Sequence, residues 1–384
     1  MKDRAYIYAD NAATTKLAPE ALDAMMPFLT DDYGNPSSLY SFSRSSKKAI
    51  EESRAIIAKC INAIPEEIVF TCGGTESDNW AIKNFVHADI HPSRNIIISP
   101  IEHHAIFYSC REAATFSNYT ITAVPVDKSG KIILPIYEIE VAKHPDAISI
   151  MLANNEIGTI ENIAQLAGIA HKQDIPFHTD AVQAIGHIPV DVKELGVDMM
   201  SASAHKFNGP KGIGFLYVKQ NTPLVPFMNG GEQEAGRRAG TENVAAIVGM
   251  ATALKINCER MLENYAKLVK MTDAFRSIIS KEIPCAVFNG DTINRLPGHI
   301  SLSLPNITSE GLMHILDLRG IAVSTGAACN SSSTEISHVL KAINLPDDLA
   351  RGTIRITFGA DNMEEDAEIT AAEIVRCYKK MQNR

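Results

Sequence analysis

Short apolar segments that alternate with helix-length stretches constrain the fold of this chain most strongly. Six such segments of four or five residues have the composition and length of buried strands. They are residues 68–71, 95–99, 147–151, 176–180, 199–202 and 214–218. Residues 75–86 and 163–173, which lie between them, have the length and apolar spacing of helices. The alternation predicts an α/β fold with a largely parallel sheet covered by helices on both faces.

The pattern changes after about residue 255. A long amphipathic helix is predicted first, followed by three strands and a closing helix, which together predict a smaller α+β unit. These elements are expected at residues 256–283, 300–304, 321–324, 353–357 and 364–381.

Composition narrows the class of function. The formal charge of −9, from 36 basic and 45 acidic residues without a basic run, argues against direct nucleic-acid binding. No stretch approaches the roughly 18 apolar residues of a membrane span, and the N-terminus carries no apolar leader, so we expect a cytoplasmic protein. The seven cysteines are scattered without metal-type spacing, which predicts free thiols and no metal site.

Lys206 and Asp180 suggest a particular cofactor. Asp180 ends one predicted strand, and Lys206 follows the next, 26 positions later (206 − 180 = 26). Pyridoxal phosphate needs a lysine amine for a Schiff base and a carboxylate that keeps its pyridinium nitrogen protonated. Either residue alone is commonly a surface charge or a turn residue, so the assignment depends on the neighbouring turns.

Those turns follow the carboxyl ends of the predicted strands, where ligands bind in parallel sheets. Gly74 and Thr75 open a predicted helix, whose N-terminus could hold a phosphate, and Ser203 and His205 could donate to the same group. A plain polar turn with a helix cap is the alternative.

Three further side chains have the chemistry of such a site. His103 could stack on a flat ring and transfer protons. Asn155 could hold a ring hydroxyl or a substrate carboxylate, and Gln183 could donate to the phenolate oxygen of the cofactor. Each of these residue types also occurs commonly in packing and turns.

Together the motifs resemble the pyridoxal-phosphate cysteine desulfurases of the NifS/IscS type, within the class V aminotransferase family. The resemblance runs nearly from end to end. The motifs that carry it are residues 10–15 (DNAATT), 33–38 (YGNPSS), 73–79 (GGTESDN), 102–103 (EH), 153–159 (ANNEIGT), 178–183 (HTDAVQ), 205–206 (HK), 209–212 (GPKG), 240–241 (GT) and 324–329 (STGAAC).

The resemblance implies the aminotransferase-like fold type I, with a mainly parallel seven-stranded sheet, and a homodimer with shared active sites. Residues 15–255 would form the large cofactor domain, and residues 1–14 and 256–384 the small domain. Lys206 would carry the Schiff base, Asp180 would pair with the pyridinium nitrogen, and His103 would stack on the ring.

The remaining roles follow from the same resemblance. Gln183 would contact the phenolate oxygen, and Asn155 and Arg355 would hold the substrate carboxylate. A guanidinium matches a carboxylate in two parallel hydrogen bonds, which is an independent reason to choose an arginine. The phosphate would be held by Gly74, Thr75, Ser203, His205 and, from the partner subunit, Thr241.

Cys329 specifies the reaction that the resemblance implies. Small residues precede it and a polar run follows, which is typical of an exposed loop. The cysteine would attack the sulfur of L-cysteine, leaving L-alanine and a persulfide on Cys329, while His103 transfers protons. The loop would pass the sulfur to an acceptor protein, either an iron–sulfur scaffold or a tRNA- or DNA-thiolation enzyme.

Four positions depart from the family pattern. Tyr40 replaces a histidine, Ser43 a glycine, Glu232 a glycine and Ala235 an arginine. All lie near the family's active-site entrance, so we expect retained but slower activity. Two alternatives remain open: a selenocysteine lyase or another aminotransferase-like enzyme that does not require Cys329, and a weakly catalytic scaffold that docks partners.

Overall fold

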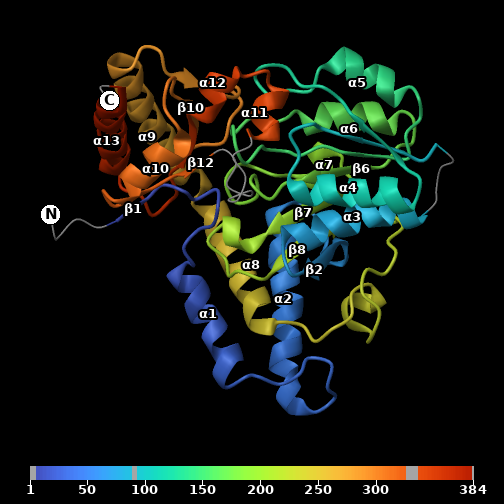
Figure 1. The fold of residues 1–384 in the computed structure, drawn as a ribbon. Coiled ribbons are helices and arrows are strands. Elements are labelled where there is room, and N and C mark those ends of the chain that lie inside the picture. Colours follow the sequence, from blue (N-terminus) through green and yellow to red (C-terminus); the bar gives the residue numbers. More distant parts are fainter. Residues whose placement is uncertain (1–5, 89–92, 326–335, 383–384) are drawn as a thin grey trace.

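A seven-stranded sheet is the largest element of the protein (Figure 1). The computed structural model describes residues 6–88, 93–325 and 336–382. The sheet order is β2-β8-β7-β6-β5-β3-β4, and all neighbours pair in parallel except β8, which is antiparallel to both β2 and β7. The strands are β2 (Ile68–Thr71), β3 (Asn95–Ile98), β4 (Thr120–Ala123), β5 (Ala147–Ser149), β6 (Phe177–Asp180), β7 (Met199–Ser203) and β8 (Gly214–Val218). The predicted α/β fold is confirmed.

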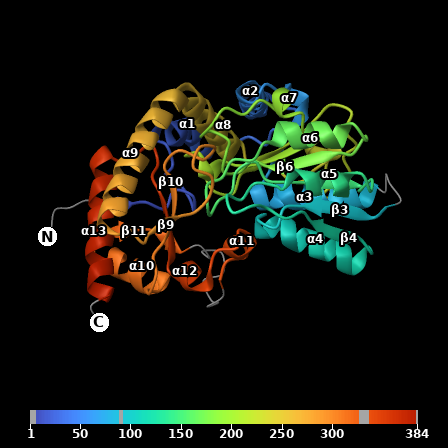
Figure 2. The same ribbon diagram turned by 90° about the horizontal axis from the view of Figure 1, so that it is seen from above.

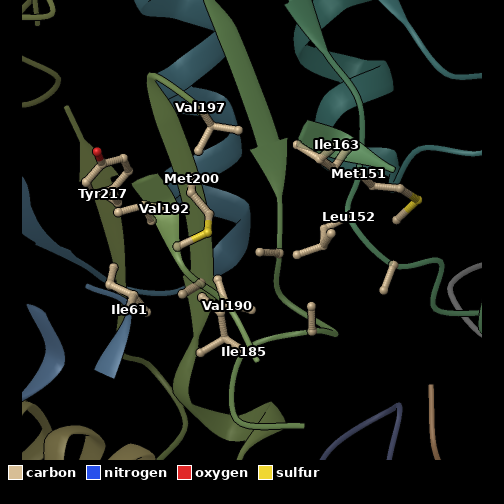
Figure 3. Close-up of a cluster of buried hydrophobic side chains, with 14 of the residues drawn as sticks. Ile61, Met151, Leu152, Ile163, Ile185, Val190, Val192, Val197, Met200 and Tyr217 are labelled. Carbon is tan, nitrogen blue, oxygen red and sulfur yellow. The ribbon is translucent and has the colours of Figure 1, made fainter. Parts of the chain in front are cut away.

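Helices cover both faces of this sheet (Figure 2). One face carries α5 (Leu134–Val141) and α6 (Ile163–His171), and the other carries α3 (Gly74–Ala88) with α4 (His104–Phe116) packed on it. Because both faces are covered, inner strands are apolar without alternation, as in β3, where Ile96 and Ile97 are fully buried. Figure 3 shows part of this core, in which side chains from β7, β8 and the loops after β5 and β6 meet.

Three helices extend from the sheet as a group, α1 (Pro19–Thr30), α2 (Arg44–Cys60) and α8 (Val244–Glu259) (Figure 1). Both α1 and α2 pack along α8. The short helices are η1 (Ser41–Ser43), η2 (Pro65–Glu67), α7 (Val192–Leu195), η3 (Ala204–Lys206) and η4 (Gln233–Gly236). Among the described residues, no helix has the length and apolar character needed to cross a bilayer.

A second, antiparallel sheet has its own apolar core. Its order is β12-β13-β10-β9, and beside it the N-terminal strand β1 (Ile7–Tyr8) pairs in parallel with β11 (Ile321–Ala322). The other elements are β9 (Val287–Phe288), β10 (His299–Ser303), β12 (Ser324–Thr325), β13 (Thr353–Thr357), α9 (Met261–Glu282), α10 (Ser309–Asp317), α11 (His338–Ala342), α12 (Asp347–Arg351) and α13 (Glu364–Gln382). Helices α9 and α13 pack side by side against this core (Figure 2).

The structure corrects three details of the predicted elements. The helix expected over residues 256–283 is two helices, because Arg260 leaves the helical conformation (φ −96°, ψ 6°) between α8 and α9. The strand expected over residues 321–324 divides at Val323, so that β11 pairs with β1 and β12 pairs with β13. Strand β4 was not predicted, since an edge strand of sequence Thr-Ile-Thr-Ala is half exposed and lacks a continuous apolar run.

Candidate active site

The predicted site residues converge on one cavity of about 630 Å³. It opens at the carboxyl ends of β6 and β7, where a parallel sheet places ligands. Ten of the predicted residues line it: Gly74, Thr75, His103, Asn155, Asp180, Gln183, Ser203, His205, Lys206 and Arg355. Thr241 is exposed and does not line the cavity. Cys329 lies outside the described residues.

Lys206 ends the short helix η3, directly after β7. Its Nζ donates hydrogen bonds to the backbone oxygens of Ala12, at 2.7 Å, and Ala13, at 2.9 Å. The N-terminal segment therefore holds the lysine amine at the cavity. Nothing near Lys206 in the sequence indicates this contact, although residues 12 and 13 belong to one of the family motifs.

Asp180 ends β6 and is buried beside this amine. Its Oδ1 accepts a hydrogen bond from the backbone N–H of Val182 at 2.8 Å. Burial raises the pKa of Asp180 to about 6, and both that hydrogen bond and the charge of Lys206 oppose the rise. The carboxylate is therefore ionised at neutral pH, as a partner for a protonated pyridinium nitrogen must be.

Two more carboxyl groups lie buried close to Asp180. Burial raises the pKa of Asp78 and of Glu102 well above the usual range, and the Asp180 charge raises both further. Asp78 Oδ1 and Glu102 Oε2 have no hydrogen-bond partner. Burial therefore disfavours the charged form of both groups, so that they add little negative charge beside Asp180. Asp78 was not predicted as a site residue, although it lies in α3 and belongs to the family motif at residues 73–79.

The turn from β2 into α3 has the features of an anion-binding site. A Cβ atom on Gly74 would lie 2.5 Å from Val182 Cγ2, and one on Gly214 would lie 2.7 Å from Gly73 Cα. Glycine at these positions lets the turn, β8 and the residues after β6 approach closely. The N-terminus of the 15-residue helix α3 then faces the cavity beside Ser203, where its backbone N–H groups favour a phosphate.

Two histidines at the cavity are neutral. Burial, followed by the charge of Lys206, lowers the pKa of His103 and of His205 to about 4. His103 Nδ1 accepts a hydrogen bond from the backbone N–H of Ala105 at 3.2 Å, which assigns the ring proton to Nε2. His205 Nδ1 lies 3.1 Å from Thr14 Oγ1. The neutral His103 ring can therefore donate a hydrogen bond from Nε2 into the cavity.

Arg355 is a buried cation on β13, 3% exposed. Its Nη2 donates to Asp10 Oδ1 at 2.8 Å and its Nη1 donates to the backbone oxygen of Asn155 at 2.9 Å. These contacts use two of the five N–H donors of a guanidinium that lines the cavity, so donors remain for a carboxylate there. Asp10 was not predicted as a site residue. It belongs to the family motif at residues 10–15, which was the available signal.

The side chains of Gln183 and Asn154 hydrogen-bond to backbone groups near the cavity. Gln183 Nε2 donates to the backbone oxygen of Ala12 at 3.0 Å, so it helps to fix the segment that holds Lys206. The Asn154 amide accepts hydrogen bonds from the backbone N–H groups of Glu156 and Ile157. It therefore shapes the turn that presents Asn155 to the cavity.

The departures from the family pattern lie in two segments. Ser43 is buried against Gly34, whose added Cβ would lie 3.0 Å from Ser43 Cα, whereas Tyr40 is 58% exposed. Ala235 adopts a left-handed conformation (φ 56°, ψ 39°), which is strained for a residue with a side chain. Its neighbour Glu234 is buried and anchors the segment by binding Arg54.

A family model described as aminotransferase class-V matches residues 7–369 of the chain. The chain belongs to this family. It is similar to a cysteine desulfurase IscS from Dictyoglomus turgidum, with 47% identity over 98% of this chain and 95% of the relative. A solved NifS-like protein matches with a TM-score of 0.90 and 35% identity over 97% of this chain and 98% of its own. A solved SspA in complex with cysteine matches with a TM-score of 0.80 and 34% identity, over 93% and 100% of the two chains.

As a member of this family, the protein is a pyridoxal phosphate enzyme. The cavity fits that cofactor. It combines a lysine amine, an ionised buried carboxylate, a neutral histidine and a glycine turn at a helix N-terminus. These are the groups that the aldehyde, the ring nitrogen, the ring face and the phosphate require.

Proposed function

We propose that the cavity holds pyridoxal phosphate and L-cysteine, and that the chain acts there as a cysteine desulfurase. The observation that carries the proposal is the convergence of Lys206, Asp180 and Arg355 on one cavity. A lysine and an acid alone suit many reactions of this cofactor. The buried guanidinium, which keeps free donors, adds a place for the carboxylate of an amino acid.

Arg355 and Asn155 orient the substrate. The guanidinium is already held by Asp10 and by the Asn155 backbone, so binding a carboxylate orders no flexible side chain. Asp180 would keep the ring nitrogen of the cofactor protonated. When bound, pyridoxal phosphate supplies the electron sink that makes a proton on the substrate Cα removable.

Lys206 is the base for that proton, because its amine lies at the same cavity and is positioned by the carbonyls of Ala12 and Ala13. His103 is neutral and carries its proton on Nε2, so it serves proton transfer at the substrate sulfur. Cys329, as thiolate, would attack that sulfur. An S–S bond then forms, the Cβ–S bond breaks, and its electron pair stays with the fragment released as L-alanine.

A homodimer completes this proposal. Side chains of α1 and of the loop that follows it expose large apolar surface: Leu22, Met26, Leu29, Tyr33, Leu39, Tyr40 and Phe42 are 45% to 98% exposed. Such a patch is typical of a protein interface. A second copy of the chain would cover it, and Thr241, which is exposed here, would reach the phosphate in the partner's cavity.

The sulfur acceptor and the division of the chain are also part of the proposal. The persulfide would pass to an iron–sulfur scaffold or a thiolation enzyme in the cytoplasm, where free thiols persist. The large domain would be residues 15–255, and the small domain residues 1–14 and 256–384. In support, one apolar cluster combines Ile7 and Ala9 with residues from 268 onward.

The test is to incubate the purified holoenzyme with L-cysteine and to measure alanine and the mass of the Cys329 peptide. We expect alanine together with a persulfide on Cys329. Cys329→Ala should retain cofactor absorbance but lose alanine formation, whereas Cys285→Ser, a matched control at an exposed thiol in the turn before β9, should behave as wild type. Alanine release at the wild-type rate by Cys329→Ala would contradict the assigned nucleophile and favour an enzyme that does not require it, such as a selenocysteine lyase.

A further inference from the structure

Two cysteines far apart in sequence meet at the ends of two packed helices. Cys60 is the last residue of α2, and Cys258 lies one residue before the end of α8. The two helices pack along each other, and both thiols are partly buried at the edge of the large apolar cluster. Neither residue lines the cavity that holds Lys206, so this pair is separate from the proposed active site.

The two thiols border a second cavity, of about 230 Å³. Its other walls include Ile61, Ile185, Val190 and Met261. Figure 3 shows Ile61, Ile185 and Val190 gathered at one edge of the core. A cavity of this size, lined by apolar side chains and by Asp191, admits a small oxidant to both cysteines.

The thiols also differ in acidity because they touch. The Cys60 thiol hydrogen bonds to Cys258, which lowers the pKa of Cys258, whereas the same contact and burial raise the pKa of Cys60. Of the neighbouring charges, Glu259 opposes ionisation of both thiols and Lys59 favours that of Cys60. Two thiols in contact at one cavity are placed so that they can form a disulfide with each other.

We propose that Cys60 and Cys258 form a redox-active dithiol that a hydroperoxide converts to a disulfide. One of the two thiols attacks a peroxide oxygen as thiolate, so the O–O bond breaks, a sulfenic acid forms on that cysteine, and an alcohol or water leaves with the proton that the thiol gave up. The other thiol then attacks that sulfur, the S–O bond breaks, and water leaves as the S–S bond forms. Two thiols are oxidised by two electrons, and the peroxide is reduced by two.

The position of the bond gives it a structural consequence. Arg260, which separates α8 from α9, follows Cys258 by two residues, and Met261 at the start of α9 lines the dithiol cavity. A disulfide would fasten this break to the end of α2. Because α9 packs in the second apolar core, oxidation would restrain the joint between the two sheets.

The test uses the wild-type holoenzyme with a slight excess of hydrogen peroxide, followed by alkylation, proteolysis without reduction and mass spectrometry. We expect one cross-linked peptide pair that contains Cys60 and Cys258 and is lighter by two hydrogen atoms, in most molecules and reversible by dithiothreitol. Cys60→Ser and Cys258→Ser should each lose the pair, and Cys285→Ser, at an exposed thiol, should keep it.

A trivalent arsenical provides a second measurement on the unaltered protein, since phenylarsine oxide bridges two adjacent thiols and releases one water. We expect a bridged adduct on Cys60 and Cys258. Peroxide treatment that oxidises Cys285 but leaves Cys60 and Cys258 as separately alkylated thiols would overturn the proposal, and so would an arsenical that fails to protect them from alkylation.

Discussion

Neutralising Glu234 tests how the segment between β8 and α8 is held. Glu234 binds Arg54 through two hydrogen bonds, of 2.7 and 2.9 Å, and accepts a third from the backbone N–H of Phe70 at 3.0 Å. The Glu234 side chain is 3% exposed and that of Arg54 is 19% exposed. Glu234→Gln removes the charge but keeps the size and one acceptor oxygen.

The expected loss of unfolding free energy depends on which contacts Arg54 loses and which it retains. Breaking a buried ion pair by removing one partner costs about 3–5 kcal/mol. Arg54 retains a hydrogen bond to the Ile68 oxygen at 2.6 Å and lies 4.3 Å from the centroid of the Phe70 ring. These contacts and its partial exposure reduce the expected cost of Glu234→Gln to about 2–3 kcal/mol. Glu234→Ala also leaves the Phe70 N–H without a partner, which adds about 1–3 kcal/mol.

The assay is thermal unfolding at fixed protein concentration and cofactor saturation. About 2–3 kcal/mol lowers the Tm by roughly 5 °C or more in a domain of this size. Glu52→Gln is the matched control, because Glu52 pairs with Lys48 at 3.5 Å on the exposed face of α2 and should cost about 0.5 kcal/mol at most. In a double-mutant cycle, Arg54→Met and Glu234→Gln should be coupled by about 2 kcal/mol.

The reasoning about a buried, charge-paired anchor is refuted if Glu234→Gln shifts the Tm no more than Glu52→Gln does. It is also refuted if the two substitutions in the cycle are additive, since independent effects would mean that Arg54 and Glu234 do not stabilise each other.

Two further predictions concern Arg355 and Glu156. Arg355→Lys should raise the KM for L-cysteine about 10- to 100-fold and change kcat less, because an ammonium cannot bind a carboxylate in two parallel hydrogen bonds. Steady-state rates of alanine formation measure both constants. An unchanged KM would contradict the carboxylate site. Glu156, whose Oε2 accepts from Ser337 Oγ at 2.5 Å, has a pKa that burial raises from 4.5 to about 7. Between pH 4.5 and pH 7 Glu156 binds a proton in the folded state that it has lost in the unfolded state, so the free energy of unfolding falls as the pH rises. Glu156→Gln does not lose this stability, so from pH 4.5 to pH 8 its free energy of unfolding should rise by up to about 3 kcal/mol relative to that of the wild type. A Tm difference that does not change with pH would contradict this.

Local patterns of apolar residues predicted most of the strands of the large sheet. Continuous apolar runs predict strands buried on both faces, and all six predicted in the large sheet are present, because such runs are stable only under two layers of helices. The errors lie where packing decides. Arg260 has no helix-breaking side chain, so the break between α8 and α9 follows from the two helices belonging to different cores. Strand β4 forms because β3 offers it an edge.

The sequence by itself predicted the cavity residues that follow strands of the large sheet, because the carboxyl ends of parallel strands share one edge. Their hydrogen-bond partners and charges were decided only by the tertiary structure. Arg355 is held by Asp10, 345 positions away, and Lys206 by carbonyls of the N-terminal segment. Burial raises the pKa of Asp180 and of its neighbours Asp78 and Glu102, and the packing of α2 on α8 brings Cys60 to Cys258. Charge states and thiol pairs depend on the surrounding dielectric and on distant neighbours, which no local pattern encodes.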